Sequence, residues 1–496
     1  MEIATIVFLS SGAFLGWSLG ANHLGNVFGT AVGTRMISFM TAAVLCSIFV
    51  VLGSVISGAG PAETVVGVGA INALAGAFMV AFSAAVAVYW MTKLGMPVST
   101  TETIIGAIVG WNLFTGSFID ADSVIKIMVT WVVCPFLSAG ISIVLYITTR
   151  FVLRVCHPHM LRLDAYTRIA LILAGSFGAY SLGANNIANV MGVFVPVNPF
   201  ADSVVGGLFA FSGVQKLFLI GGLAIAVGVM TYSHRVVHTV GRSLFSLTPV
   251  TAWVVVMSHS LVLFLFASEG LEQWLAGHGL PTIPLVPVSS SQAVVGAVLG
   301  IGIVKDWRAI RWGMAVRIAS AWVTSPIIAG IISFVGLFIV QNVFNQNVYS
   351  PTAYSISQAV TERLTEDGVE ATPLLPLIGT RFASTASFVD AIDGANDYTR
   401  RQTKTILDLA KIDNIVVDAT KLDRLSQGLL TPQERAAVVK LDGRRYAHDW
   451  LFARDLAAAS PEWLSLPETT VNKLANRALD AKRRALYNLF RTPPAS

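Results

Sequence analysis

Two short polar stretches, nearly identical to each other, interrupt apolar runs of this chain. SLGANHLGNVFG covers residues 18–29, and SLGANNIANVMG covers 181–192. Each stretch places amide side chains, which both donate and accept hydrogen bonds, beside glycines. Because glycine lets the backbone leave helical geometry, we expect each stretch to break a membrane helix where it is packed in protein or lines a cavity. The amide oxygens and freed carbonyls of such breaks suit a small hard cation such as Na+.

A second pair of motifs combines a proline with a run of hydroxyl side chains. PVSTTE covers residues 97–102, and PVSSSQ covers 287–292. Proline ends a preceding helix, and serine or threonine suits the N-cap of the next one. A helix that begins there offers free N–H groups, a positive dipole end and hydroxyl donors, which bind an anion without a basic side chain. Two such starts facing each other would hold a tetrahedral oxyanion. Close helix packing by small residues is the alternative explanation.

The elements that carry these motifs are predicted to be membrane helices. Of the 496 residues, 54% are hydrophobic and only 12% are charged, about half the charged fraction of a soluble domain. The apolar runs suffice for about ten crossings of roughly 20 residues each. The three cysteines lack CxxC spacing and the net charge is only +5, so neither a thiolate metal site nor nucleic-acid binding is indicated. We find no convincing nucleophile–base pair, and no enzymatic activity is predicted.

The same landmarks occur in the same order in both halves of the chain. Each half runs from a GAN stretch to a PVS stretch and then to a span containing Trp and Pro, at 131–135 and at 322–326. This order indicates an internal duplication. Loop charges place the basic segment 150–168 in the cytoplasm. Each half then crosses the membrane an odd number of times, so the halves are inverted relative to each other, as in many secondary transporters.

The predicted fold is an all-α polytopic membrane protein. It has two inverted-topology repeats of about five crossings each, with broken or re-entrant helices, and a small helical soluble C-terminal region. Counting the crossings leaves this C-terminal region outside the cell, although large domains obey the charge rule poorly. The expected divisions are transmembrane repeat 1 (1–149), a basic cytoplasmic connector (150–168), transmembrane repeat 2 (169–341), a linker (342–399) and a helical soluble appendage (400–496).

The paired motifs, together with TVGR at 239–242 and LTP at 247–249, resemble the inorganic phosphate transporter (PiT) family over roughly residues 1–340. The resemblance implies a secondary active transporter that takes up inorganic phosphate by alternating access, with Na+ or H+ as coupling ion and no cofactor. Some relatives are assigned sulfate. A sulfate permease of the same fold and a transporter-derived phosphate sensor are therefore the alternatives.

The resemblance also assigns residues to a midplane site. Substrate is expected at Asn22, Asn26, Ser99, Thr100, Thr101, Asn185, Asn189, Ser289, Ser290 and Ser291. The coupling ion is expected at Asn22, His23, Glu102, Asn185, Asn186 and Gln292. If this ion is Na+, its ligands are expected among Asn22, Asn185, Ser99 and Ser289.

The chain departs from the family pattern at two positions in each half. Where the family usually reads GAND, the fourth position here is His23 or Asn186, and where histidine often follows the hydroxyl run, this chain has Glu102 or Gln292. We hypothesise that position 23 pairs with 102 and position 186 with 292, which would concentrate coupling chemistry in the first half. The loss of both aspartates tilts the prediction slightly towards sulfate, or towards proton coupling through His23 and Glu102. Phosphate stays the first choice because Glu102 can accept its proton.

The remaining predictions concern partners and location. The expected partners are inorganic phosphate or sulfate and membrane lipid, without nucleic acid, and the resemblance is compatible with a homodimer. The predicted location is the cell (inner or plasma) membrane, which the chain crosses several times.

Overall fold

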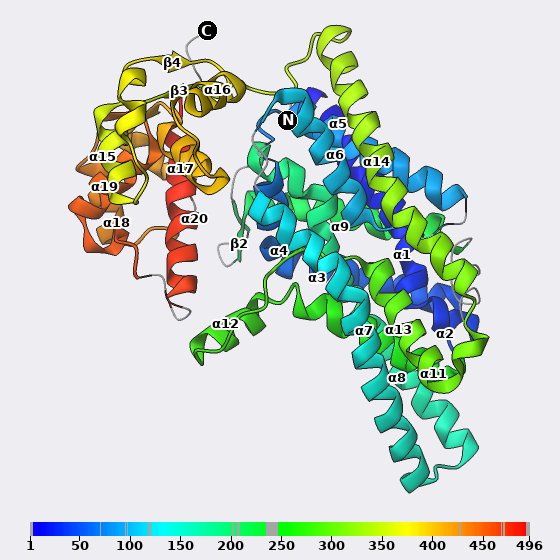
Figure 1. Cartoon of the computed structure of the whole chain (residues 1–496). Coiled ribbons are helices and arrows are strands. Elements are labelled where there is room, and N and C mark those ends of the chain that lie inside the picture. The colour runs from blue at the N-terminus through cyan, green and yellow to red at the C-terminus, as the bar shows by residue number, and fades with distance from the viewer. Residues whose placement is uncertain are drawn as a thin grey trace.

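A computed structural model gives the fold of the chain (Figure 1). It describes residues 3–492 except for 70, 95, 97, 118–120, 201–202, 206–208, 235–246, 426–427, 468 and 470–471. Pro97 of the first hydroxyl motif and the TVGR segment at 239–242 therefore lie outside the described residues.

Ten long helices, counted over the described residues, form the membrane part, five in each half. The first half contains α1 (Ile3–Val27), α3 (Phe39–Ser57), α5 (Leu74–Lys93), α6 (Thr100–Thr115) and α7 (Ala121–Cys156). The second half contains α8 (Met160–Met191), α9 (Gly213–Thr231), α11 (Pro249–Leu265), α13 (Ser290–Asp306) and α14 (Trp312–Asn342). The predicted all-α polytopic fold is confirmed.

The helices differ in whether they are long enough to cross a bilayer. Among the described residues, six are long and apolar enough, and α11 with α12 (Glu269–Gly277) forms a further candidate bent by 64°. The two helices that begin at the hydroxyl motifs, α6 and α13, have only 16 and 17 residues, whereas a span needs about 20. Because their first turns are also fully buried, we infer that both helices begin inside the membrane part.

The four most extensive helix contacts each join one helix from each half. They pair α1 with α9, α3 with α8, α6 with α14 and α7 with α13. The largest buried apolar cluster likewise draws on both halves, from Leu9 in α1 to Leu337 in α14. Since eight of the ten long helices make their most extensive contact with a helix of the other half, we infer that the two repeats fold as one interlocked unit.

The glycines of the two GAN stretches permit two of these contacts. A β-carbon on Gly20 would lie 2.0 Å from the carbonyl oxygen of Ile225 in α9, and one on Gly183 would lie 2.1 Å from that of Val50 in α3. Helix backbones approach this closely only where a side chain is missing. The two glycines hold equivalent places in the motifs, so their packing role is duplicated with the repeat.

The prediction that the GAN stretches break their helices is wrong. α1 continues as far as Val27 and α8 as far as Met191, so both stretches are helical. The chain leaves α-helical geometry only just after each motif. Phe28 separates α1 from the short helix α2 (Gly29–Gly33), and the 3-10 segment η1 (Gly192–Val197) follows α8. The glycines serve close packing, which needs an absent side chain but no change of backbone conformation.

Two polar side chains of the motifs bond back to their own helices. A ring nitrogen of His23 lies 3.0 Å from the carbonyl oxygen of Leu19, and the Asn186 amide donates to that of Leu182 at 3.2 Å. These contacts lie at the same place in each repeat. They satisfy buried polar groups without unwinding the backbone.

The basic segment 150–168 is not a separate connector. α7 continues to Cys156 and α8 begins at Met160, so only a short turn joins them. Because arginine is a good helix former, α7 extends beyond the apolar part of its sequence. His157, with a φ of 38°, reverses the chain direction. The two helices form a long hairpin that extends beyond the rest of the bundle (Figure 1).

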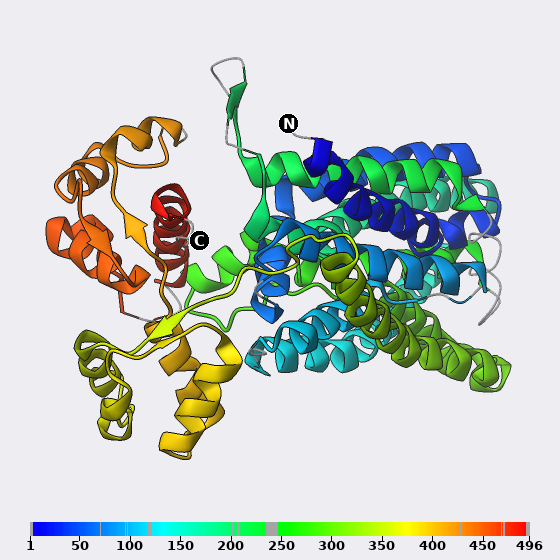
Figure 2. The same cartoon turned by 90° about the horizontal axis from the view of Figure 1, so that it is seen from above.

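The sequence pattern gave no sign of a β-hairpin between η1 and α9. Strand β1 (Ser203–Val205) pairs antiparallel with β2 (Phe209–Phe211). The hairpin projects from the bundle near the N-terminus (Figure 2).

The appendage begins near Tyr354, so the predicted linker 342–399 is wrong over most of its length. Residues 354–410 bury a core of their own, which includes Tyr354, Phe388 and Ile406. The sequence did not predict this core because its short amphipathic helices contain few apolar residues. Its elements are β3 (Tyr354–Ser355), α15 (Gln358–Glu366), η3 (Thr372–Leu377), β4 (Arg381–Phe382), α16 (Thr385–Ala395) and α17 (Arg400–Ala410).

A second core completes the appendage. It is built around Phe452, Trp463 and Phe490, and a short antiparallel pair of strands contributes Ile415 and Tyr446 to it. Its elements are β5 (Ile415–Val416), η4 (Ala419–Arg424), α18 (Pro432–Val439), β6 (Arg445–Tyr446), α19 (Asp449–Ala459), η5 (Pro461–Trp463) and α20 (Lys473–Phe490).

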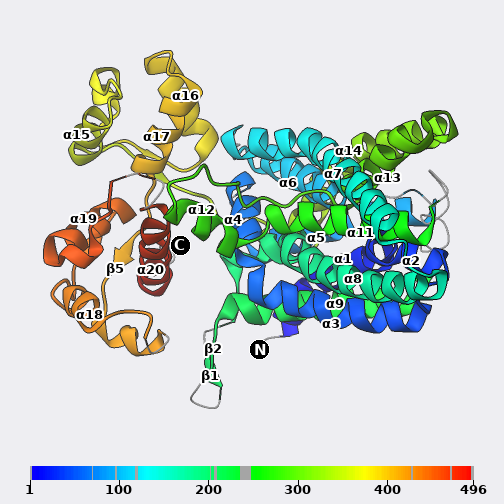
Figure 3. The ribbon, with the colours of Figure 1, turned by 90° about the horizontal axis from the view of Figure 1, so that it is seen from below.

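Helix α20 joins the appendage to the membrane part. Its apolar side chains Leu479, Leu486 and Phe490 pack in the second appendage core. Arg477 and Arg484, two turns apart on α20, instead form ion pairs with acidic residues of the bundle. Figure 3 shows α20 beside α12, at the end of the bundle opposite the tip of the α7–α8 hairpin.

One guanidinium group connects the appendage to both repeats. Arg477 donates from Nη1 to Glu272 Oε2 in α12 at 2.7 Å, and its Nε lies 3.4 Å from Glu63 in α4 (Ala59–Val68). Arg484 adds a contact of 3.5 Å to Glu63. Glu63 belongs to the first half and Glu272 to the second, so the contact bridges the two repeats.

Because α3 and α8 approach closely at Gly183, we predict that Gly183→Ala lowers the free energy of unfolding by about 3 kcal/mol. This is the upper end of the usual cost of overpacking, since the added β-carbon would force backbone atoms to move. Thermal unfolding of the purified protein in detergent measures the effect. Gly140→Ala in α7, where a β-carbon would meet nothing within 4 Å, is the control. Equal unfolding temperatures for the two variants would contradict the packing.

The docking contact predicts that Arg477→Gln loosens the appendage. Glu272 is only 2% exposed, and loss of this ion pair should weaken docking by about 1–2 kcal/mol, since Arg477 itself is partly exposed. Limited proteolysis within residues 343–353 should become faster. Arg435→Gln, which removes an ion pair with Asp423 on the exposed surface of the appendage, should leave the rate unchanged. Equal rates for both variants would argue against docking through this contact.

Candidate functional site

The fourteen residues predicted for the site are all buried, each between 0 and 4% exposed. They come from four elements: the C-terminal parts of α1 and α8, and the starts of α6 and α13. These residues are Asn22, His23, Asn26, Ser99, Thr100, Thr101, Glu102, Asn185, Asn186, Asn189, Ser289, Ser290, Ser291 and Gln292.

The hydroxyl runs cap their helices as the sequence predicted. Ser99 Oγ accepts a hydrogen bond from the backbone N–H of Glu102, and Ser289 Oγ accepts one from that of Gln292, both at 3.3 Å. The other N–H groups of a first helical turn have no partner within the helix. Two positive helix ends therefore open into buried surroundings.

The two helix starts face each other. Thr101 Oγ1 donates to the carbonyl oxygen of Val288 at 3.3 Å, and Ser291 Oγ donates to that of Val98 at 3.1 Å. These residues hold equivalent positions in the two hydroxyl motifs. The bonds thus cross the boundary between the repeats in both directions.

The last asparagine of each GAN stretch also bonds across the repeats. Asn26 Nδ2 donates to Ser290 Oγ at 3.1 Å, and Asn189 Nδ2 donates to Thr101 Oγ1 at 2.8 Å. Each helix start is therefore joined to the GAN stretch of the other repeat.

The first asparagine of each stretch bonds within its own repeat. Asn22 Nδ2 donates to Thr92 Oγ1 in α5 at 3.0 Å. Asn185 donates to the carbonyl oxygen of Val286 at 3.1 Å and accepts from the N–H of Val288 at 3.0 Å. Asn185 thereby fixes the backbone that leads into α13.

The hypothesis that positions 23 and 102 form one pair, and 186 and 292 another, is wrong. Glu102 Oε1 instead accepts a hydrogen bond from Gln292 Nε2. His23 and Asn186 turn their polar atoms back towards their own helices, and Asn186 Oδ1 accepts from Asn189. The two positions that follow the hydroxyl runs therefore meet each other where the helix starts face.

Several buried oxygens around these helix starts have no hydrogen-bond partner among the described residues. They are Asn22 Oδ1, Thr100 Oγ1, Glu102 Oε2, Asn189 Oδ1 and Gln292 Oε1. Buried polar atoms are rarely left without a partner, and unpartnered oxygens are the kind of ligand that a hard cation takes. The site thus combines unpartnered oxygens with the donor-rich helix ends.

The four residues predicted as Na+ ligands differ in how free their oxygens are. Asn22 Oδ1 has no partner, whereas the side-chain oxygens of Asn185, Ser99 and Ser289 already accept hydrogen bonds. In the described part of the chain no three His, Cys, Asp or Glu side chains group as metal ligands. A cation here would rest on neutral oxygens and on Glu102, a donor set that fits Na+.

A histidine outside the predicted residues belongs to the same network. His259 of α11 is fully buried, and its Nε2 lies 2.8 Å from Ser290 Oγ. The sequence carried a signal for it, because a lone imidazole within the apolar run 249–265 must find a partner. Thr92, which binds Asn22, carried no comparable signal, since a lone threonine in a membrane helix usually bonds to its own backbone.

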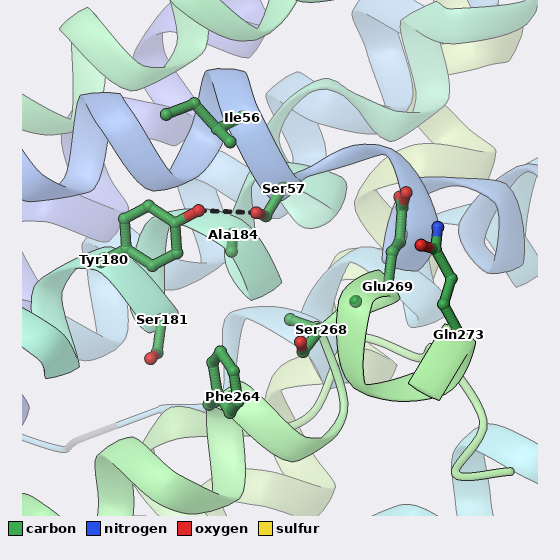
Figure 4. A pocket seen from close by; sticks show the side chains of 11 residues that line it. Ile56, Ser57, Tyr180, Ser181, Ala184, Phe264, Ser268, Glu269 and Gln273 are labelled. Carbon is green, nitrogen blue, oxygen red and sulfur yellow. Dashed lines mark hydrogen bonds between the residues drawn. The ribbon is translucent and has the colours of Figure 1, made fainter. Parts of the chain in front are cut away.

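A pocket of about 350 Å³ adjoins the second GAN stretch at the appendage end of the bundle. The Ser57 and Tyr180 hydroxyls on its wall are hydrogen-bonded at 2.7 Å (Figure 4). Ala184, which precedes Asn185, also lines it, so the pocket touches the helix that carries the site. Its polar lining is completed by Ser181, Ser268, Glu269 and Gln273.

Comparison with known proteins gives a family match. The chain matches the model of the phosphate transporter family over residues 19–272 and 280–471. The match confirms the resemblance inferred from the motifs and runs beyond residue 340, where we expected it to end.

Individual relatives agree with this match. A protein of Pyrococcus horikoshii named putative phosphate permease is 26% identical over 66% of this chain and 95% of its own length. A protein of Methanocaldococcus jannaschii with the same description is also 26% identical, over 68% of this chain and 97% of its own length. A sulfate permease of Bacillus subtilis is 27% identical over 68% of this chain and 88% of its own length. A solved structure titled the sodium-dependent phosphate transporter matches with a TM-score of 0.55 and 21% identity over 68% of this chain and 99% of that one. At this identity the likeness concerns the fold.

Proposed function

Because the chain belongs to the phosphate transporter family, we propose that it is a secondary active transporter that takes up inorganic phosphate across the cell membrane. The observation that carries the proposal is the meeting of two capped helix starts, one from each inverted repeat, at one buried site. Inverted repeats that meet around a midplane site are typical of alternating-access carriers.

The anion would be held by donors of both repeats. The first-turn N–H groups of α6 and α13, with the hydroxyls of the two motifs, supply hydrogen bonds and a favourable dipole field. Phosphate at neutral pH carries a proton, which needs an acceptor. Glu102 Oε2, buried and without a partner, can accept it, which favours phosphate over sulfate.

The coupling ion would be Na+, bound next to the anion. The unpartnered oxygens of Asn22, Asn189 and Gln292 offer it neutral ligands, and its charge would offset that of the anion. Asn189 also bonds to Thr101, so occupation of one site would affect the geometry of the other. Proton coupling through His23 and Glu102 is the alternative.

The charge of the α7–α8 hairpin bears on the orientation of the protein in the membrane. If its basic tip is cytoplasmic, the appendage and the adjoining pocket lie on the outer side (Figures 1 and 3). The pocket would then be the outer approach to the site, next to the contact between Arg477 and Glu272.

Sulfate is the second candidate substrate. A sulfate permease is among the relatives of comparable identity, and this chain lacks both aspartates of the usual GAND motif. Sulfate carries no proton at neutral pH and is bound by donors alone, which the helix starts provide.

Uptake into liposomes tests the proposal. We expect concentrative accumulation of labelled phosphate that depends on a Na+ gradient and is weakly inhibited by sulfate. Equal uptake in K+ medium would exclude Na+ as the driving ion, and stronger inhibition by sulfate than by phosphate would identify a sulfate permease. Binding of phosphate without uptake would favour a sensor, and passive flux alone would favour a channel.

The role given to Glu102 predicts the effect of Glu102→Gln. An amide presents donors where the carboxylate accepted, so the ratio of phosphate to sulfate uptake should fall about tenfold, the equivalent of one charge-assisted hydrogen bond. Ser83→Ala is the control, because the buried Ser83 hydroxyl bonds to the carbonyl oxygen of Met79 in its own helix and its loss should leave the ratio unchanged. Phosphate preference that survives Glu102→Gln would assign the phosphate proton to another acceptor.

A further inference from the structure

We propose that His259 is a positioning residue that directs the hydroxyl proton of Ser290 towards the transported anion. The inference rests on the proposed function, since it takes Ser290 as part of the anion site. It concerns a residue on α11, a helix that contributes neither a GAN stretch nor a hydroxyl motif.

Ser290 Oγ has two nitrogen neighbours. Asn26 Nδ2 lies 3.1 Å away and His259 Nε2 lies 2.8 Å away. The amide nitrogen of Asn26 can only donate, so it occupies one lone pair of the hydroxyl oxygen. The direction of the second bond depends on which ring nitrogen of His259 carries the proton.

The surroundings of His259 favour one tautomer. Its Nδ1 has no hydrogen-bond partner in the part of the chain that the structure describes, and the residue is fully buried. With the proton on Nδ1, that N–H would stay buried without an acceptor even when the anion is bound. With the proton on Nε2, the donor left over is the Ser290 hydroxyl, for which the bound anion is an acceptor. We therefore place the proton on Nε2, from which His259 donates to Ser290.

This tautomer fixes the state of the serine. Ser290 Oγ then accepts from both Asn26 and His259, and both of its lone pairs are occupied. Its own proton has no acceptor among the described contacts of the residue. Ser290 is thus held as a donor at the start of α13, where an oxyanion would bind the two helix ends.

The equivalent position of the first repeat has no such support. Thr100 corresponds to Ser290 in the hydroxyl motif, and its buried Oγ1 has no hydrogen-bond partner. Its hydroxyl rotor is therefore free to turn. The second repeat presents an oriented donor where the first presents an unoriented one, so His259 adds an asymmetry that the motifs do not contain.

Equilibrium binding of labelled phosphate to the purified full-length protein tests the inference. His259→Gln can place an amide N–H near the position of Nε2 and should bind within about threefold of wild type. His259→Asn, with a shorter side chain, and His259→Leu, with no donor, should bind about tenfold more weakly, as expected for the loss of one hydrogen bond. Rescue by Gln but not by Asn separates positioning from simple packing.

A double-mutant cycle gives a second readout. In a Ser290→Ala background, His259→Leu should cause no further loss, because the group it orients is gone. Ser260→Ala is the folding control, since Ser260 Oγ bonds only to backbone oxygens of Ala174 and Val256. Its affinity for phosphate should equal that of wild type, and unfolding temperatures confirm that each variant is folded.

Two outcomes would overturn the inference alone. One is equal phosphate affinity for the Gln, Asn and Leu variants, and the other is an undiminished effect of His259→Leu in the Ser290→Ala background. Failure of the wild-type protein to bind either phosphate or sulfate would overturn the proposed function and the inference together.

Discussion

A polar site buried in a membrane protein depends on hydrogen bonds from the surrounding protein, because unpaired polar groups are costly there. In this chain the partners come from the other repeat. Asn26 of the first half bonds to Ser290 of the second, and Asn189 of the second bonds to Thr101 of the first. Neither half could form the site alone. The interlocked helix pairs follow from this requirement as much as from apolar packing.

The contacts between helices suggest which parts could move relative to each other. The GAN stretches lie on α1 and α8, which pack on α9 and α3, while the hydroxyl motifs begin α6 and α13, which pack on α14 and α7. The site therefore lies between two sets of helices, each drawn from both repeats. Glycine-mediated contacts hold the pairs of each set closely together, whereas α5 and α11 pack against helices of both sets and hydrogen bonds of the site run between the sets. A movement of one set against the other would change these hydrogen bonds and leave the glycine-mediated helix pairs intact.

The sequence predicted the duplication, the burial of all the candidate site residues and the two N-caps, because these depend on local chemistry and on repeated order. Three features were beyond it. A glycine needed for packing, such as Gly183, has the same signature as one needed for a helix break. The meeting of Glu102 with Gln292 depends on how the repeats face each other, which spacing along the chain does not encode. The appendage core near Tyr354 is built from short helices whose apolar residues are too few to stand out.

The two halves are unequal in a way that differs from the sequence hypothesis. His23 and Glu102 suggested that ionisable groups belong to the first half, but Glu102 is bonded by Gln292 of the second, and His259 of the second half contacts Ser290, the partner of Asn26. The ionisable groups are thus divided between the repeats and connected across the boundary. At one end of the bundle Arg477 also connects ionisable groups of both repeats, because it forms ion pairs with Glu63 and Glu272. Ionisable groups therefore lie on the contacts that join the two repeats, both inside the bundle and at its end.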